Sequence, residues 1–238
     1  MAKFILGALT ALALTACGGG DGDAPGKGPT QAPPASCQPI AAVNIQMFGD
    51  STYLGYGAST DSQGNITYAP AAMIQRAMDA RFGAGAVKVY DNASAGTTST
   101  QLIDGTDGIN APWPGSVMPT AHIVIVNHGI NDEEKGTPLA TYKANFEAFA
   151  SLKVPVVLQT ASPTLQAWDN PAYAQTVRDV AAATGAGLAD VQKYMSGIGN
   201  LDQYLADGIH PNDLGYQAIV NNVTLPALMP LVAKLKCQ

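Results

Sequence analysis

Phe48-Gly49-Asp50-Ser51 is the stretch that decides how the rest of the chain is interpreted. The apolar run Ile45–Phe48 leads into it, and a strand followed at once by a glycine, an acid and a serine presents the serine at the carboxyl edge of a sheet. Open α/β sheets bind their ligands at that edge. A serine hydroxyl is a poor nucleophile alone, because it needs a base within hydrogen-bond reach and a third group that orients the base. Ser51 therefore directs the search to a histidine and a carboxylate elsewhere in the chain.

Apolar runs alternate with segments of helical periodicity over residues 37–238. The predicted strands are Ile45–Phe48, Val87–Tyr90, Ile123–Asn127, Val154–Gln159 and Gly187–Asp190, and the predicted helices are Ala69–Arg81, Leu139–Ser151, Pro171–Thr184 and a last one from about Asn212. Most strands are continuous Val, Ile and Leu runs, which is typical of strands covered on both faces. Five β–α repeats with short links predict one α/β domain with a parallel sheet between helix layers.

The first 16 residues are predicted to be a signal peptide. Lys3 precedes the apolar run Phe4–Leu14, which is too short to span a bilayer as a mature helix. Leu14-Thr15-Ala16-Cys17 resembles the lipobox of bacterial lipoproteins. That resemblance implies cleavage after residue 16 and lipidation of Cys17. The alternative is an ordinary signal peptide followed by an incidental cysteine.

Residues 17–36 are predicted to be a lipidated cysteine and a flexible tether, because they are rich in Gly, Pro and Ala and poor in bulky apolar side chains. Gly18 stands where an inner-membrane lipoprotein of enteric bacteria carries Asp, so the resemblance implies the outer membrane of a Gram-negative bacterium. We expect no further apolar segment long enough to cross a membrane.

Charge and cysteine content narrow the class further. The chain has 12 basic and 18 acidic residues, a net charge of −6, and no basic run, which argues against a nucleic-acid partner. Cys37 and Cys237 stand at the two ends of the domain, and we expect them to pair because an exported chain enters an oxidising compartment. Two free thiols are the alternative. The three histidines lack ligand spacing, so a zinc site is not expected.

The candidate base is His210, in Asp207-Gly208-Ile209-His210-Pro211. Pro211 disfavours helical geometry at His210. A loop of this kind lets the Asp207 carboxylate fold back onto the imidazole, hold one tautomer, and stabilise the imidazolium formed when Ser51 gives up its proton. The alternative is a helix entry in which the acid or Asn212 acts as a cap.

The other two histidines are weaker candidates. His122 opens an apolar strand, and we expect it to be a boundary residue. His128 follows the same strand, where it either contacts substrate or packs beside the strand end.

An acyl-transfer site also needs donors for a developing oxyanion. Gly96, in Asn92-Ala93-Ser94-Ala95-Gly96, follows the second strand and lets the backbone aim an N–H at a substrate. Asn131, in His128-Gly129-Ile130-Asn131-Asp132, follows the third strand and offers a side-chain amide. The alternatives are a plain turn glycine and a helix cap.

These blocks together resemble the SGNH hydrolase superfamily, also called GDSL esterases and lipases. Gly49-Asp50-Ser51, Gly96, Gly129-x-Asn131-Asp132 and Asp207-x-x-His210 occur in that order. The resemblance implies a flavodoxin-like three-layer α/β/α sandwich with a mostly parallel five-stranded sheet. It also implies Ser51 as nucleophile, His210 as base and Asp207 as orienting acid. The implied oxyanion donors are the N–H groups of Ser51 and Gly96 and the side chain of Asn131.

The function implied by this resemblance is a serine esterase that hydrolyses carboxylic esters through an acyl-enzyme, without a metal or organic cofactor. The expected partners are an ester substrate and, through Cys17, a membrane. One alternative is an O-deacetylase of acetylated polysaccharide or peptidoglycan. An alternative of another class is a non-catalytic carbohydrate-binding lipoprotein. Thr52 stands where the namesake motif has Leu, a position that varies in the superfamily.

Several neighbouring residues have open roles. Ser94 is a rival nucleophile, because its context is close to the Gly-x-Ser-x-Gly elbow, although Asn92 replaces the first glycine of that turn. Asp50 and Asp132 are expected to hydrogen-bond loop backbone around the site. Four aromatic residues are expected in or near loops at the same edge, either as an acyl or sugar wall or as ordinary packing: Tyr53, Tyr56, Trp113 and Trp168.

Overall fold

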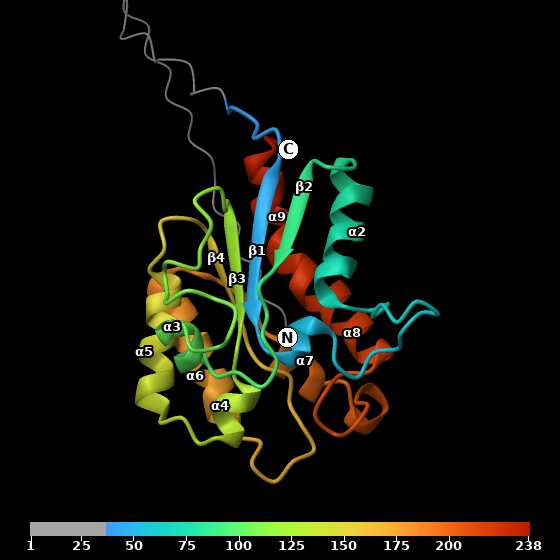
Figure 1. The fold of residues 1–238 in the computed structure, drawn as a ribbon, viewed down its shortest axis with the longest axis vertical. Coiled ribbons are helices and arrows are strands. Elements are labelled where there is room, and N and C mark those ends of the chain that lie inside the picture. The colour runs from blue at the N-terminus through green and yellow to red at the C-terminus, as the bar shows by residue number, and fades with distance from the viewer. Residues whose placement is uncertain (1–36) are drawn as a thin grey trace, which may run out of the picture. The chain divides into compact units, whose positions relative to one another are not determined.

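The computed structural model describes residues 37–238. The expected signal peptide, Cys17 and the tether lie outside the described residues, and those predictions stay untested. The centre of the described domain is one five-stranded sheet (Figure 1). Its strands are β1 (Val43–Gly49), β2 (Val87–Asp91), β3 (Ile123–Asn127), β4 (Val156–Gln159) and β5 (Gly187–Ala189).

All neighbouring strands are parallel, in the order β2-β1-β3-β4-β5. The five strands, and the parallel sheet, are therefore confirmed. The strand order reverses at β1, which pairs with β2 on one side and β3 on the other. Ligands of doubly wound sheets bind beside such a switch point, outside the carboxyl ends of the strands. Ser51 directly follows β1 there.

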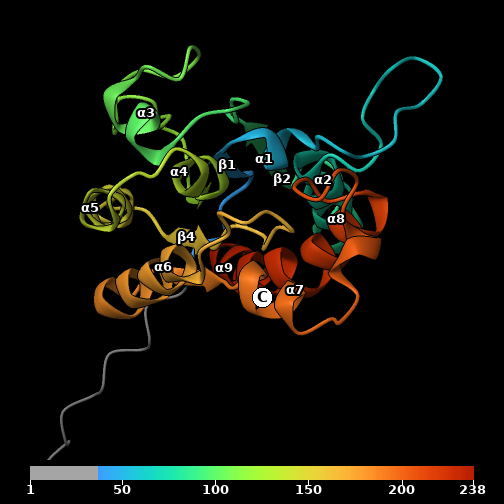
Figure 2. The same ribbon diagram turned by 90° about the horizontal axis from the view of Figure 1, so that it is seen from below.

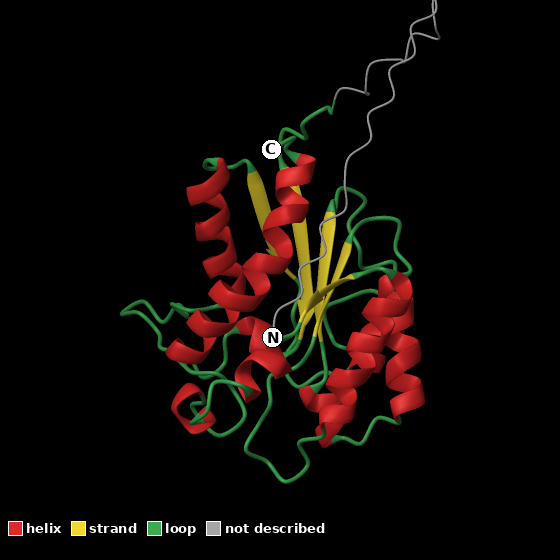
Figure 3. Ribbon diagram, turned by 180° about the vertical axis from the view of Figure 1, so that it is seen from behind, coloured by secondary structure: helices red, strands yellow, loops and turns green. Residues whose placement is uncertain are grey.

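Helices cover both faces of the sheet (Figure 3). One face carries α2 (Pro70–Phe82), α7 (Val191–Ser196), α8 (Asp213–Ile219), the π-helical turn η2 (Val220–Thr224) and α9 (Leu225–Leu235). The other face carries α3 (Ser99–Asp104), α5 (Leu139–Ala150) and α6 (Pro171–Thr184). The remaining short helices are α1 (Ser51–Leu54), α4 (Ile130–Glu134) and the 3-10 turn η1 (Leu201–Tyr204). The expected three-layer α/β/α fold is confirmed.

Alternation along the strands builds the two cores. In β3, Ile123 and Ile125 pack in the core with α2 and α9, whereas Val124 and Val126 pack with α5 and α6. Successive strand residues point to opposite faces, so a continuous apolar strand supplies both layers. This is why the central strands lack the polar alternation of a half-exposed sheet.

Boundaries differ from the sequence prediction for local reasons. β4 begins at Val156 rather than Val154, because Pro155 has no N–H to donate to a ladder. α2 begins at Pro70, a residue suited to the first helical turn, where an N–H has no intrahelical partner anyway. The helices α1, α3, α4 and α7 were not expected. Each has four to six residues, too few for a periodic apolar pattern.

The expectation that no further apolar segment reaches membrane-spanning length is wrong by length and composition. The continuous helix Asp213–Leu235 is long and apolar enough to cross a membrane. Its Ile219, Leu228 and Val232 side chains nevertheless belong to a core cluster beneath the sheet. In this structure the segment is a packed helix of the domain.

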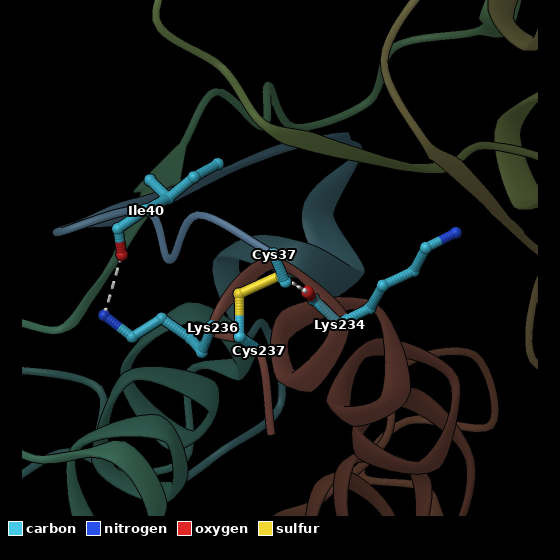
Figure 4. Close-up of a disulfide and its surroundings, with 5 residues drawn as sticks. All are labelled: Cys37, Ile40, Lys234, Lys236 and Cys237. Carbon is cyan, nitrogen blue, oxygen red and sulfur yellow. Dashed lines mark hydrogen bonds between the residues drawn. A yellow bond between two sulfur atoms is a disulfide. The ribbon is translucent and has the colours of Figure 1, made fainter. Parts of the chain in front are cut away.

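A disulfide joins the two ends of the described domain (Figure 4). Cys37 precedes β1 and Cys237 follows α9, with 5.8 Å between their Cα atoms. Lys236 Nζ donates to the Ile40 carbonyl at 3.0 Å, so the same two segments are also joined by a hydrogen bond. The bridge closes a loop of 200 residues and is expected to contribute at most about 5 kcal/mol in the chain-entropy model.

Candidate active site

Ser51 is held at the start of α1 by its neighbours. Asp50 is the N-cap of this helix and accepts hydrogen bonds from the Thr52 N–H at 3.0 Å and the Thr52 hydroxyl at 2.8 Å. A Cβ at Gly49 would lie 2.8 Å from the Asn127 carbonyl oxygen, so only glycine fits where β1 turns into α1. As the first helical residue, Ser51 has no intrahelical acceptor for its own N–H.

His210 and Asp207 lie in line with Ser51. The Ser51 Oγ is 2.9 Å from His210 Nε2, and His210 Nδ1 is 2.8 Å from Asp207 Oδ2. Residues 159 positions apart are thus brought together at one sheet edge. The hydroxyl, the imidazole and the carboxylate form a continuous hydrogen-bonded chain in the order that nucleophilic catalysis by serine requires.

The loop 205–211 fixes the direction of Asp207. Its Oδ1 accepts from the backbone N–H groups of Ile209, at 3.0 Å, and His210, at 2.8 Å, which leaves Oδ2 for the imidazole. Burial opposes ionisation of this half-exposed carboxyl, but these backbone and imidazole contacts outweigh it and lower the pKa of Asp207. The loop therefore holds a carboxylate, rather than a carboxylic acid, against the ring.

Of the two caps that the alternative for this segment named, Asn212 is confirmed and the acid is not. α8 begins at Asp213, and Asn212 is its N-cap, accepting from the Gly215 N–H at 3.1 Å. Asp207 and His210 therefore lie before the helix and do not cap it. The helix entry and the Ser51 contact are both present.

Gly96 and Asn131 reach the same edge from two sides. Gly96 has a φ of +71°, and a Cβ built on it meets no heavy atom within 4 Å, so this backbone faces open space. Asn131 lies in the first turn of α4 rather than in a loop, and its Nδ2 donates to Asp50 Oδ2 at 3.2 Å. Figure 2, seen from below, shows α1 and α4 close together. The structure thus joins Asn131 to the residue before Ser51.

Among residues 37–238, Ser94 has no histidine or carboxylate side chain as a hydrogen-bond partner. Its hydroxyl donates to the Asp107 carbonyl at 2.7 Å, and its N–H donates to the Gly49 carbonyl at 2.9 Å. Both contacts join the loop after β2 to its surroundings. Ser94 is a structural residue in this arrangement.

His122 and His128 do not contact Ser51 in the described domain. His122 Nδ1 accepts from the Asn44 N–H at 3.0 Å beside the amino ends of β1 and β3, as expected of a boundary residue. His128 is only 1% exposed, and among residues 37–238 its Nδ1 has no hydrogen-bond partner. His128 is therefore packed beside the end of β3.

The four aromatic candidates separate by environment. Tyr53 is buried in α1 and lines a small pocket together with Thr52 and Tyr216. Trp113 packs edge-on against Phe48 and Phe149. Neither ring is an exposed wall of the site. Trp168 is half-buried in the loop before α6. Tyr56 is 51% exposed, and its ring centroid lies 5.7 Å from that of His210. It is the aromatic candidate whose ring the structure places on the His210 imidazole.

Asp132 and Ser99 form a buried polar cluster near the same edge of the sheet. Asp132, fully buried, accepts from the Ser99 N–H at 2.9 Å and the Ser99 hydroxyl at 2.8 Å. Burial raises the pKa of Asp132, while His128 and the contacts with Ser99 act in the opposite direction. Asp132 thus fixes backbone, as expected, by joining α4 to the first residue of α3.

Two neighbours of the site were missed from the sequence. Ser99 had a signal, because Thr98-x-x-Gln101 is a capping box that marks the start of α3. Lys135, whose Nζ donates to the Gly96 carbonyl, had none. Within residues 37–238, no group of three or more His, Cys, Asp or Glu side chains is arranged to hold a metal ion.

Comparisons with known proteins agree with this architecture. Residues 47–218 match the model of the GDSL-like lipase/acylhydrolase family. TesA is 20% identical with a TM-score of 0.59, over 79% of this chain and 99% of its own. A lipase/acylhydrolase from Enterococcus faecalis is 20% identical with a TM-score of 0.60, over 81% and 95%. Axe2, an acetylxylan esterase from Geobacillus stearothermophilus, is 15% identical with a TM-score of 0.59, over 80% and 94%. No curated protein matches the chain.

Proposed function

The chain belongs to the GDSL-like lipase/acylhydrolase family, and from this membership we propose that it is a serine esterase in which Ser51 is the nucleophile. The observation that carries the proposal is the unbroken chain from Ser51 Oγ through the His210 imidazole to Asp207, with contacts of 2.9 and 2.8 Å. An exposed serine without such partners is not nucleophilic near neutral pH. The family supports ester hydrolysis, and the geometry supports these three residues for it.

The proposed reaction proceeds in two halves. His210 Nε2 takes the Ser51 proton as Oγ attacks the ester carbonyl, and the same proton passes to the leaving alcohol when the acyl-oxygen bond breaks. Water then enters, His210 removes its proton, and the acid is released from the acyl-enzyme. Asp207 stays ionised throughout and holds the ring with Nε2 toward Ser51.

Three donors are proposed to stabilise the tetrahedral oxyanion: the N–H groups of Ser51 and Gly96, and the Asn131 amide. An amide nitrogen carries two hydrogens. One of those on Asn131 is used by Asp50, which leaves the other to reach a substrate. Removing one donor from such a site typically lowers kcat by about 10²–10³.

The narrower alternative, an O-deacetylase of acetylated glycans, is favoured by Tyr56. The proton from His210 goes to the alcohol oxygen, so the alcohol part of the substrate lies beside His210 and the exposed Tyr56 ring. A sugar face packs well on such a ring, and Axe2 is an acetylxylan esterase. Comparing kcat/KM for acetylated xylan, p-nitrophenyl acetate and longer acyl esters separates this alternative from a general esterase.

Membrane tethering through Cys17 is a second proposal, supported by the lipobox-like Leu14-Thr15-Ala16-Cys17 and the Gly- and Pro-rich residues after it. Metabolic labelling with an alkyne fatty acid should label the full chain, and Cys17→Ser should remove the label. Fractionation would then locate the protein in the outer membrane. Unlabelled, fully released protein would contradict the anchor.

The direct test of the esterase proposal is labelling by a fluorophosphonate probe, together with hydrolysis of p-nitrophenyl acetate. Ser51→Ala should abolish both. Ser94→Ala, a serine in the neighbouring loop, should leave both within about twofold. A protein that neither reacts with the probe nor turns over acetate, butyrate or acetylated-glycan substrates would favour the non-catalytic carbohydrate-binding alternative.

A further inference from the structure

We propose that Lys135 is a positioning residue for the oxyanion site: its ammonium holds the Gly96 carbonyl, which restrains ψ of Gly96 and with it the backbone turn that carries the Gly96 N–H. The inference rests on the proposed esterase function and adds a residue that the family blocks do not include. It concerns an exposed lysine just beyond α4, whose Nζ donates to the Gly96 oxygen.

Gly96 requires such a restraint because of its own chemistry. Glycine has the freest backbone, and this one, at a φ of +71°, has no heavy atom within 4 Å of its missing side chain. A donor in an oxyanion site acts only when it already points at the developing charge. Other contacts hold the rest of the loop, among them the Thr97 hydroxyl, which donates to the Ser94 carbonyl at 2.6 Å. The Lys135 contact acts on Gly96 itself.

α4 is the element that brings the proposed donors together. Asn131 donates to Asp50 at 3.2 Å, on the side of the nucleophile. Asp132 accepts from Ser99 at 2.8 and 2.9 Å, at the start of α3. Lys135 then holds Gly96, which lies three residues before Ser99. One short helix thus contacts the segments on both sides of the proposed oxyanion.

The two links from α4 to the Gly96 segment differ in environment. The Asp132 link is fully buried, so it contributes to folding as well as to geometry. The Lys135 link is exposed, and exposed ammonium contacts contribute little to stability. Loss of the Lys135 link should therefore change catalysis without unfolding the protein, which makes Lys135 the informative position to substitute.

The experiment compares Lys135→Met and Lys135→Arg with Lys143→Met in the full chain. Lys143 is another exposed lysine, on α5, paired with Glu147 and not with the site. For p-nitrophenyl acetate, Lys135→Met should lower kcat about tenfold while KM stays within twofold, because the oxyanion contact forms only in the transition state. Lys135→Arg should recover most of the rate. The rate of fluorophosphonate labelling should fall in parallel, and Tm should not change.

Two results would overturn the inference: an unchanged kcat in Lys135→Met, or an increase in KM alone, which would indicate a substrate contact. A fall in Tm that matches the loss of rate would also count against it, because the lysine would then be structural. Failure of the esterase proposal itself gives a different result, since the unsubstituted chain would already be inactive toward ester and probe.

Discussion

Two sets of serine, histidine and aspartate lie near the carboxyl edge of the sheet, and they are connected differently. In the first, His210 lies between Ser51 and Asp207 and hydrogen-bonds to both. In the second, Ser99 bonds directly to Asp132, and the Nδ1 of His128 has no partner among residues 37–238. The three side chains of the second set are at most 1% exposed. Residue types alone do not distinguish a reactive set from a structural one.

The order of the groups and their access to solvent make the difference. Ser51 faces a basic imidazole nitrogen, whereas Ser99 donates its proton to a carboxylate that also accepts the Ser99 N–H. The carboxyls differ as well. Hydrogen bonds lower the pKa of half-exposed Asp207, and burial raises the pKa of Asp132. We therefore propose chemistry for the first set, which we call the open set (Ser51, His210 and Asp207). For the second, the buried set (Ser99, His128 and Asp132), we propose that it holds α3 to α4.

The strongest test of the difference between the two sets is to remove the hydroxyl of Ser51 and of Ser99 in turn. Ser51→Ala should lower kcat for p-nitrophenyl acetate by at least about 10³-fold, since the nucleophile is gone, while Tm changes little. Ser99→Ala should keep most of the activity, because the Ser99 N–H still bonds to Asp132, but should lower the stability by about 1 kcal/mol. Initial rates and thermal unfolding measure the two effects. Equal losses of activity in the two variants would remove the distinction between the sets.

The second effect in size concerns the acid of the open set. Asp207→Asn should lower kcat by about 10²–10⁴, because an amide does not stabilise the imidazolium and can favour the wrong tautomer of His210. Asp213→Asn is the matched control, as Asp213 lies on α8 and bonds to Ser59 rather than to the histidine. Steady-state kinetics on the folded proteins compares kcat of Asp207→Asn with that of Asp213→Asn. A kcat within threefold of the unsubstituted enzyme would show that His210 is oriented without Asp207.

Much of this arrangement could be predicted from the sequence because its signals are local or topological. Apolar runs such as Ile123–Asn127 marked the strands, and β–α repeats place all strand ends at one edge. Ser51 and His210 could therefore be expected to meet, although 159 positions separate them. The family blocks then supplied Gly96 and Asn131 as candidates.

The contacts made by α4 and by Lys135, just beyond it, could not be predicted in the same way. Ser99 and Asp132 are 33 residues apart, and Lys135 and Gly96 are 39 apart, with no periodic pattern connecting them. Their pairing depends on the direction in which α4 projects its side chains. This five-residue helix is mostly polar, so no apolar periodicity in the sequence predicts that direction. Trp113 follows the packing alternative. The sequence could not choose between the two alternatives, because a loop residue that packs into the core resembles a surface aromatic in sequence.

A third prediction sharpens the comparison on the buried side. Asp132→Asn should lower the free energy of unfolding by about 1–3 kcal/mol, because its amide group presents donors to an N–H and a hydroxyl that now donate to a carboxylate. Its kcat should fall less than that of Asp207→Asn. Urea unfolding at an unchanged m-value measures the stability, and Asp179→Asn, at an exposed position of α6, is the control. Unchanged stability in Asp132→Asn would mean that the buried set does not hold α3 to α4.

The last prediction is a pH dependence of stability at Glu133, the residue after Asp132 of the buried set. Burial, with Asp169 and Asp132 adding to it, raises the pKa of Glu133 to about 8, although the Asn170 N–H acts in the opposite direction. In the unfolded chain a glutamate titrates near 4.3, at about its ordinary pKa. Between these values the folded state keeps a proton that the unfolded state has lost, so the free energy of unfolding falls as pH rises.

Glu133→Gln should remove this fall in stability with pH. In the unsubstituted protein, Glu133 Oε2 accepts a hydrogen bond from the Asn170 N–H at 2.7 Å. The amide oxygen of the glutamine can still accept it. The Tm of the unsubstituted domain, relative to the variant, should therefore decline from about pH 5 to 8 and level off above. Asp207 has the opposite sign, because its lowered pKa stabilises the fold above the pKa of an unfolded aspartate and that contribution is lost in acid. Parallel Tm curves for Glu133→Gln and the unsubstituted domain would show that Glu133 is ionised in the folded protein at neutral pH. The pKa values of Glu133 and Asp207 would then not be shifted in opposite directions on folding.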